Sequence, residues 1–207
     1  VWLTDRQDMI DVFNRNGFRT ISSRSEIQHD WLWTYSMLVP VWLDLDVCDL
    51  WNGPYLHATG DVVLRPTGKS VGIKTSGNPD YDQDLARSVS VEQLVDAIPS
   101  DYTIYSFHKD EIIEHPRVIN WMTNSTTWED TMNAAASMDV IISTCTSLPH
   151  MSSAMGVKTI IMTPILKYYV WAGEEAVSPW YSDNTTVLHQ SAPNDWSSVM
   201  SQIKGML

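Results

Sequence analysis

The chain has 207 residues, 43% of them hydrophobic and 18% charged, and its 25 acidic residues outnumber 13 basic ones to give a formal net charge of -12. This composition excludes wholesale disorder, and the length suffices for a sizeable core. The acidity argues against general binding to nucleic acid or to anionic membranes, which both need a basic face, but not against a small anionic ligand held by a few local cations.

Residues 1–67 are predicted to contain one helix, one strand and an irregular stretch. Apolar residues at helical spacing predict a helix over residues 5–14, and residues 18–22 are expected to form a strand. No strand is predicted before the helix, so this part looks like a βα unit entered in its middle. Residues 23–60 are expected to be an irregular connector, because prolines and glycines interrupt them.

From residue 68 onward, strands are predicted to alternate with helices. The predicted strands span residues 70–75, 102–107, 139–142 and 158–162. The predicted helices span residues 91–98, 128–137, 147–155 and 196–203, and Thr126 or Thr127 is available to cap the second. This alternation predicts an α/β domain whose parallel sheet is wound by right-handed crossovers. Ligands bind such sheets beyond the carboxyl ends of the strands, so the loops to inspect are 76–90, 107–127, 143–150 and 163–182.

The segment Ser-Thr-Cys-Thr-Ser-Leu-Pro-His, residues 143–150, joins an apolar strand to a helix rich in small residues. Backbone N–H groups and hydroxyls at the start of a helix attract anions, so Thr146 and Ser147 are candidate phosphate ligands, with His150 one turn deeper. The alternative is an ordinary Ser or Thr cap followed by a histidine that packs the helix. Spacing by itself favours that alternative.

A second candidate segment follows the first strand of this domain. Gly77 permits close approach of the backbone to a ligand, Asn78 follows it in the turn, and Arg87 has the planar fork that binds phosphate bidentately. The alternative is a Gly-Asn turn with a solvated Arg87 paired with Asp82 or Asp84. No G-x-G-x-x-G and no Walker A sequence occurs, so dinucleotide dehydrogenases and P-loop enzymes lack their motif here.

Two further loops carry candidate ligands. Lys109 or His108 is placed to meet a phosphate and Glu111 a ribose hydroxyl, although an ordinary solvated loop has the same charges. Trp180 and Tyr181 are candidates for stacking on a base or sugar, and packing under a loop is the alternative.

Other chemistries find little support. The six histidines are scattered and no C-x-x-C pair occurs, so we expect no metal and no cofactor. The nucleophile elbow G-x-S-x-G of hydrolases is absent. Cys145 lies between a strand and a helix, where a thiol pKa can be lowered, but an inert, partly buried thiol is the simpler interpretation.

Cellular location is inferred from three features. Two cysteines form no disulfide framework, which favours a reducing, cytoplasmic location. The apolar stretch 31–43 is too short to cross a bilayer and is interrupted by Pro40, so we expect no membrane span. No signal peptide is visible, and the start at Val1 suggests a piece of a longer protein.

Taken together, the segments resemble the C-terminal part of TPR-associated glycosyltransferases, bacterial relatives of the heptosyltransferases and, more distantly, of O-linked N-acetylglucosamine transferase. The family's motifs are a strand with a Gly-Asn-Pro turn, Asp-x-x-Arg-Ser, a Ser-Leu-Gln-Lys strand end, an Asp-Thr helix with its following strand, Ser-x-Asp-Thr-x-x-x-His with a later Gly, and Ser-Pro-Trp-Tyr. Their counterparts here are, in that order, residues 71–79, 84–88, 106–109, 130–143, 143–156 and 178–181. Residues 30–40 and 54–56 look like the family's interdomain stretch. Each motif is short, but their shared order over nearly the whole chain is far more specific.

The resemblance implies a GT-B architecture, in which the active site lies between two Rossmann-like domains, each a parallel sheet with helices on both faces. Residues 68–207 would be the domain that binds a nucleoside-diphosphate sugar, usually a UDP-, ADP- or GDP-sugar. Residues 1–67 would be a remnant of the N-terminal, acceptor-side domain with the interdomain linker. The positions that match the family's diphosphate side are Arg87, Thr146, Ser147 and His150; those that match ribose or phosphate positions less closely are Asn78, Lys109 and Glu111.

The implied reaction transfers the sugar to a hydroxyl of a sugar, a lipid-linked glycan or a protein, without a metal. The family's catalytic base would lie in the missing part of the N-terminal domain, so the catalytic residue is unknown and we expect little or no activity from this chain. Cys145 stands where the family has Asp, which removes a charge beside the diphosphate.

That departure leaves open a non-catalytic nucleotide- or sugar-binding module. The same fold also suits a GT-B-like sugar-nucleotide epimerase, and a purely structural domain is the third possibility. The surplus tryptophans of the linker either pack between domains or stay exposed and promote a homodimer; they are Trp31, Trp33, Trp42 and Trp51.

Overall fold

The computed structural model describes residues 1–207 apart from 51–52, 62–63, 126, 172–175, 177 and 182. Its main body is a parallel six-stranded sheet in the order β5-β4-β3-β6-β7-β8. The strands are β3 (Ser70–Lys74), β4 (Thr103–Ser106), β5 (Val118–Ile119), β6 (Val140–Thr144), β7 (Thr159–Thr163) and β8 (Thr185–His189). The predicted parallel α/β fold is therefore confirmed.

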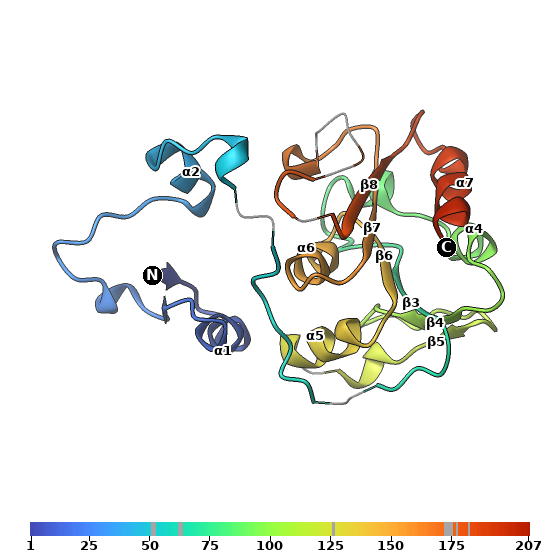
Figure 1. Ribbon diagram of the computed structural model, residues 1–207, viewed down its shortest axis with the longest axis horizontal. Helices are drawn as coiled ribbons and strands as arrows, with labels where there is room; N and C mark the ends of the chain where they lie inside the picture. The colour runs from blue at the N-terminus through green and yellow to red at the C-terminus, as the bar shows by residue number, and fades with distance from the viewer. Residues whose placement is uncertain (51–52, 62–63, 126, 172–175, 177, 182) are drawn as a thin grey trace.

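Helices cover both faces of this sheet (Figure 1). They are α3 (Asp84–Arg87), α4 (Val91–Ala97), α5 (Trp128–Ala136), α6 (Ser147–Ala154) and α7 (Ser197–Met206). Two separate apolar cores follow from this layering, one between the sheet and α4 and α7, the other between the sheet and α5 and α6. The central strands β3, β6 and β7 are buried on both sides, which is why they are nearly continuous apolar runs. The architecture is Rossmann-like.

The two faces of the central strand β3 differ in what they contact. Val71 and Ile73 point into the core shared with α4 and α7. Gly72 points the other way, where an added Cβ would lie 2.4 Å from the Phe107 ring and 2.5 Å from Ile141. Because side chains alternate along a strand, Lys74 follows Gly72 onto the α5 and α6 face.

β3 and β6 pair with each other at the centre of the sheet. Asp139 accepts hydrogen bonds at Oδ2 from the backbone N–H and the hydroxyl of Ser70, 2.7 and 3.0 Å away, and its own N–H donates to the Ser70 hydroxyl. These bonds fix the register in which Lys74 lies opposite Ser143. The crossover connections diverge at this pair, because β4 and β5 lie on one side and β7 and β8 on the other.

Most predicted elements agree with the observed ones to within two residues, and Thr127 provides the cap of α5 through a capping box with Asp130. The alternative cap, Thr126, lies outside the described residues. Strands β5 and β8 and the short helix α3 were not predicted. The expectation that no strand precedes the first helix is wrong: β1 (Trp2–Leu3) pairs in parallel with β2 (Thr20–Ile21) across α1 (Gln7–Arg15). A strand of two residues is too short to display a period in the sequence.

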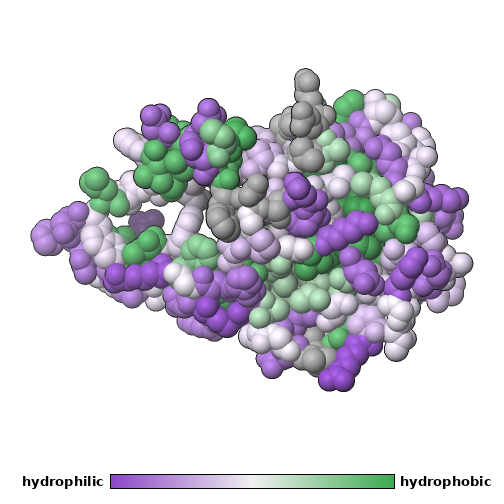
Figure 2. All heavy atoms as spheres, in the orientation of Figure 1, coloured by the Kyte–Doolittle hydropathy of each residue, from purple (hydrophilic) through white to green (hydrophobic). Residues whose placement is uncertain are grey.

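The stretch between β2 and β3 contains little regular structure, as predicted. It holds helix α2 (Val39–Trp42) and three 3-10 turns, Arg24–Glu26, Ser36–Leu38 and Val47–Asp49; two more, Met122–Asn124 and Tyr169–Trp171, lie in the main body. Hydrophobic side chains gather on the surface of the arm that carries α2 (Figure 2). Trp33 and Trp42 are 76% and 74% exposed, whereas Trp31 is half-buried beside Arg19. The remaining linker tryptophan, Trp51, lies outside the described residues.

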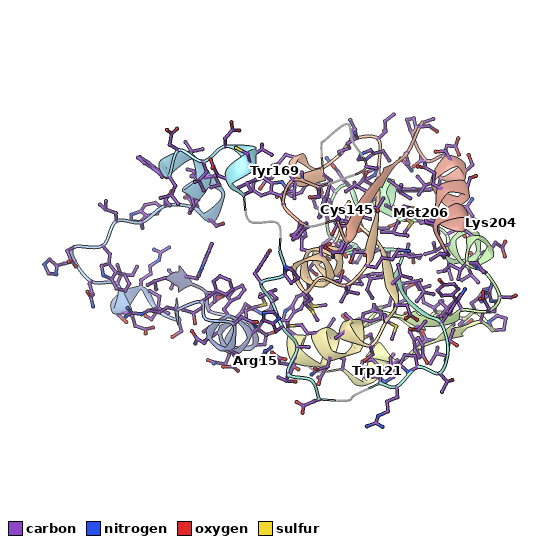
Figure 3. All side chains as sticks on the ribbon, viewed as in Figure 1. Arg15, Trp121, Cys145, Tyr169, Lys204 and Met206 are labelled. Carbon is purple, nitrogen blue, oxygen red and sulfur yellow. The ribbon has the colours of Figure 1, made fainter. Side chains whose placement is uncertain are left out.

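The N-terminal elements nevertheless pack on the main body. Arg15 at the end of α1 forms an ion pair with Glu129 of α5 (Figure 3). Further along, the backbone N–H groups of Tyr55 and Leu56 both donate to the carbonyl of Ala154 in α6, at 2.9 and 3.1 Å. Of the helices in the described part of the chain, none has the length and apolar character needed to cross a bilayer.

Candidate functional site

A cavity of about 840 Å³ opens at the carboxyl ends of β3, β4, β6 and β7. This is the edge where the crossover connections diverge, which is the place where α/β sheets bind ligands. Eight of the ten predicted site residues line it: Gly77, Asn78, Arg87, Lys109, Glu111, Thr146, Ser147 and His150. The topology thus brings together segments that are far apart in the sequence.

Trp180 and Tyr181, the two residues predicted to stack on a base or sugar, are not among the residues that line this cavity. Trp180 is 37% exposed, and its backbone N–H donates to the Ser178 hydroxyl. Tyr181 packs against buried residues behind the cavity wall. Its contacts there include His150, which does line the cavity.

Arg87 is held in an arrangement that we call the Arg87 clamp. Its Nε donates to Asp84 Oδ1 at 2.8 Å and its Nη1 to the carbonyl of Cys145 at 2.7 Å, while the guanidinium lies 4.7 Å from the centre of the Tyr81 ring. Of the two sequence alternatives for its partner, the structure therefore selects Asp84. The pair is not solvated, since the side chains of Arg87 and Asp84 are only 13% and 10% exposed.

The clamp joins the loop after β3 to the loop after β6, because Asp84 and Cys145 belong to these two loops. Asp84 Oδ1 also accepts from the backbone N–H of Gly77 at 3.0 Å. Gly77 has no room for a side chain: an added Cβ would lie 2.0 Å from Arg87 Nη2. Among the described residues, Nη2 has no hydrogen-bond partner and Nη1 uses one of its two N–H groups, so both nitrogens keep a donor for a ligand.

The start of α6 leaves backbone donors free for an anion. Thr146 occupies the cap position, but its hydroxyl lies 3.3 Å from the Ser143 hydroxyl and does not cap the helix. The N–H groups of Ser147 and Leu148 have no acceptor within the described ranges, and Pro149 has no N–H. Such orphan donors, together with the helix dipole, attract negative charge. The predicted phosphate-side segment therefore has the local geometry of an anion site.

His150 belongs to a cluster of aromatic side chains at the wall of the cavity. Its Nδ1 is 2.7 Å from the hydroxyl of Tyr181, and its ring centre is 4.5 Å from that of Trp171. Burial lowers the pKa of His150 to about 4, so the ring is neutral at pH 7. Burial also raises the pKa of Tyr181, which shares a side-chain hydrogen bond with Tyr55. These contacts with Tyr181 and Trp171 fix the orientation of the His150 ring and leave Nε2 as the ring nitrogen available to a ligand.

His108, which also lines the cavity, holds another of its side chains in place. The backbone N–H of Thr75 donates to His108 Nε2 at 3.0 Å, so Nδ1 carries the ring proton and faces Glu111 Oε2 at 3.1 Å. Burial, with a smaller contribution from the nearby charge of Lys74, lowers the pKa of His108 to about 4. The contact with Glu111 is therefore a hydrogen bond from a neutral ring. His108 is 3% exposed and holds the carboxylate that the sequence assigned to a ribose hydroxyl.

Cys145 does not have the environment of a reactive thiolate. Burial raises its pKa, although Arg87 opposes that shift. The side chain is half-buried where β6 leads into α6 (Figure 3), and its backbone carbonyl is occupied by Arg87. Of the two interpretations drawn from the sequence, these observations support the inert thiol.

Sequence reasoning missed two charged residues of the site, Lys74 and Asp84. Lys74 was treated as part of a strand, and only its place after Val71 and Ile73 in the alternation shows which face it takes. Asp84 appeared as one of two possible partners of Arg87, but its bond to the Gly77 N–H carried no sequence signal. No group of three metal-binding side chains occurs among the described residues.

No family model, curated protein or solved structure matches this chain.

Proposed function

We propose that this chain is the nucleotide-sugar-binding part of a GT-B glycosyltransferase. The observation that carries the proposal is the cavity at the divergence point between β3 and β6. An uncapped helix start, Lys74 and Arg87 line this cavity, although the chain as a whole has a net charge of -12. A nucleoside diphosphate fits this combination, since its diphosphate needs donors and cations while its ribose needs a carboxylate such as Glu111.

The proposed reaction is group transfer from a nucleoside-diphosphate sugar to a hydroxyl. The acceptor oxygen attacks the anomeric carbon, the bond from that carbon to the diphosphate oxygen breaks, and the acceptor proton goes to a general base. Within this chain, the N–H groups at the start of α6 would stabilise the negative charge that develops on the departing diphosphate. The neutral His150, oriented by Tyr181 through Nδ1, would present Nε2 to the same group.

A second candidate, a nucleotide- or sugar-binding module without catalysis, is favoured by Cys145. The residue lines the cavity, and burial keeps its pKa raised, so it brings no negative charge to the site at neutral pH. The two proposals share the ligand and differ in turnover. Release of free UDP from a UDP-sugar in the presence of hydroxyl acceptors supports the transferase, whereas binding without release supports the module.

The ligand is tested by thermal unfolding of the chain with UDP, GDP, ADP and CMP. A ligand that binds only the folded state raises the melting temperature, so at least one nucleoside diphosphate should raise it while CMP raises it less. If none of the four shifts the melting temperature, the donor-binding proposal is wrong.

The role of the α6 N–H groups is tested by Ser147→Pro, which removes one donor. Proline suits this first helical position, and the extended backbone of Thr146 tolerates a following proline. The loss of one hydrogen bond to a charged group should weaken UDP binding by about 10- to 100-fold. Ser147→Ala is the matched control, because it keeps the N–H group. Equal affinities for UDP in the two variants would remove these donors from the site.

A further inference from the structure

Lys74 lies at the junction of the two halves of the sheet, and it is the last residue of β3. The alternation of β3 places it on the same face as α6, and the register sets it beside Ser143, four residues before the start of that helix at Ser147. Lys74 lines the cavity together with Thr146 and Ser147. Its side chain and the free N–H groups of α6 therefore approach the same volume from neighbouring strand ends.

Four charged groups lie near Lys74: the guanidinium of Arg87, which has the same sign, and three carboxylates, of which two already accept hydrogen bonds from other groups. Glu111 accepts the Nδ1 proton of His108, and Asp84 accepts from Arg87 Nε and the Gly77 N–H. Asp110, the third nearby carboxylate, is exposed at the rim of the cavity. Lys74 itself makes no hydrogen bond and no ion pair with any described residue.

An ammonium group in this position lacks a counter-ion in direct contact among the described residues. Burial lowers the pKa of Lys74, and the neighbouring carboxylates only partly oppose that shift. Lys74 is half-buried, and a charge that has lost part of its hydration is stabilised by a partner of opposite sign. Lys74 and the uncapped N–H groups of α6 line the same cavity. An anion that binds there would give both the ammonium group and these N–H groups the partner that they lack among the described residues.

We propose that Lys74 and the start of α6 bind one and the same anionic group of the ligand, so that Lys74 is the cation that neutralises the diphosphate. This inference rests on the proposed function for the identity of the ligand, and it adds the residue that selects a diphosphate over an uncharged nucleoside. Lys109, the lysine predicted from the sequence, is exposed at the rim and is not placed by any strand. The test must therefore distinguish binding of the anion by Lys74 from binding by Lys109.

Pyridoxal 5′-phosphate, an aldehyde that carries a phosphate, is the probe for the first experiment. The unprotonated lysine amine attacks the aldehyde carbon with loss of water, and borohydride delivers hydride to the imine carbon to give a stable secondary amine. A lysine with a lowered pKa reacts fastest near pH 7, so peptide mass spectrometry should find Lys74 modified ahead of the exposed Lys204 of α7. Inorganic pyrophosphate and UDP should each protect Lys74.

The second experiment measures UDP affinity by calorimetry for three variants. Lys74→Met should weaken binding by about 10- to 100-fold, Lys74→Arg should restore much of the loss because it keeps the charge, and Lys204→Met should leave binding unchanged. The melting temperature of each variant without ligand shows whether it folds. If Lys74→Met fails to fold, the protection experiment on the unmodified chain decides the question.

The outcomes separate the two proposals. If UDP binds the unmodified chain and Lys74→Met binds it equally well, or if the loss falls on Lys109→Met instead, the role of Lys74 is refuted and the proposed function stands. If pyrophosphate protects Lys74 while no nucleotide binds, the anion site is supported and the nucleotide-sugar function is refuted. Modification of Lys74 that neither pyrophosphate nor UDP slows refutes the role of Lys74.

Discussion

Replacing Gly77 by alanine should disrupt the Arg87 clamp. The new Cβ would lie 2.0 Å from Arg87 Nη2, 2.6 Å from Arg87 Cζ and 2.7 Å from Asp84 Oδ1, which are distances that no real contact tolerates. The end of an arginine side chain is ordinarily able to move away. Here the carboxylate of Asp84 and the carbonyl of Cys145 hold it, so the guanidinium must leave its partners to make room.

The size of the effect follows from the bonds that are lost. The hydrogen bond from Arg87 to the Cys145 carbonyl involves a charged donor and contributes about 1.5–3 kcal/mol, and weakening the nearly buried pair with Asp84 adds to this loss. The lower chain entropy of alanine in the unfolded state returns about 0.4–1 kcal/mol. We therefore expect Gly77→Ala to lower the free energy of unfolding by about 1–3 kcal/mol, or the melting temperature by roughly 2–4 °C for each kcal/mol.

The assay is thermal unfolding followed by circular dichroism. Gly205→Ala is the matched control, because Gly205 lies in α7 and an added Cβ there meets no atom within 4 Å. It should be neutral or raise the free energy of unfolding by up to about 1 kcal/mol, since alanine favours a helix over glycine.

A double-mutant cycle with Arg87→Ala tests the reasoning itself. Once the guanidinium is absent, Gly77→Ala should cost clearly less than it does beside Arg87, because two of the three colliding atoms are gone and only Asp84 Oδ1 remains. If Gly77→Ala destabilises the chain equally with and without Arg87, the Arg87 clamp is not the reason why position 77 holds a glycine.

The remaining predictions concern the two buried histidines and the hydroxyl that orients one of them. Because the pKa values of His108 and His150 are lowered to about 4 in the folded chain, the unfolded chain binds their protons first as the pH falls below 6.5. The free energy of unfolding should therefore fall by about 1 kcal/mol per pH unit for each histidine between pH 6 and 4.5, and urea unfolding of His150→Gln should show a slope smaller by nearly one proton; an unchanged slope contradicts the assignment. Tyr181→Phe removes the partner of His150 Nδ1 and should cost about 1 kcal/mol of stability and weaken UDP binding, whereas unaltered UDP affinity would show that the bond does not position the ring.

The strands that the sequence predicted well are those buried on both faces. Residues 140–142 and 159–162 form apolar or β-branched runs because helices cover the sheet on each side. β5 has two residues and gives no period, and β8 begins with two threonines that follow Asn184 and interrupt the hydrophobic pattern. The local sequence therefore predicted the strands that are most deeply buried. It did not predict the strands at the edges of the sheet, where burial is weaker.

The candidate site could be located from the sequence but not assembled from it. Topology places the carboxyl ends of parallel strands at one edge, so the loops that carry Thr146 and Gly77 could be named in advance. Which side chain meets which partner depends on contacts across the fold: Arg87 bonds to a carbonyl 58 residues away, and His150 to a hydroxyl 31 residues away. No local pattern encodes such pairings.

The pairing of β3 with β6 has a consequence for how the chain folds. Ser70 and Asp139, which fix that pairing, are 69 residues apart, whereas β3 pairs with β4 and β6 with β7 over much shorter stretches of chain. Closing so long a loop is slow compared with forming local contacts. The cavity lies on this late junction, so a refolding molecule has both half-sheets before it has a binding site, and the recovery of ligand binding would time the last step of folding.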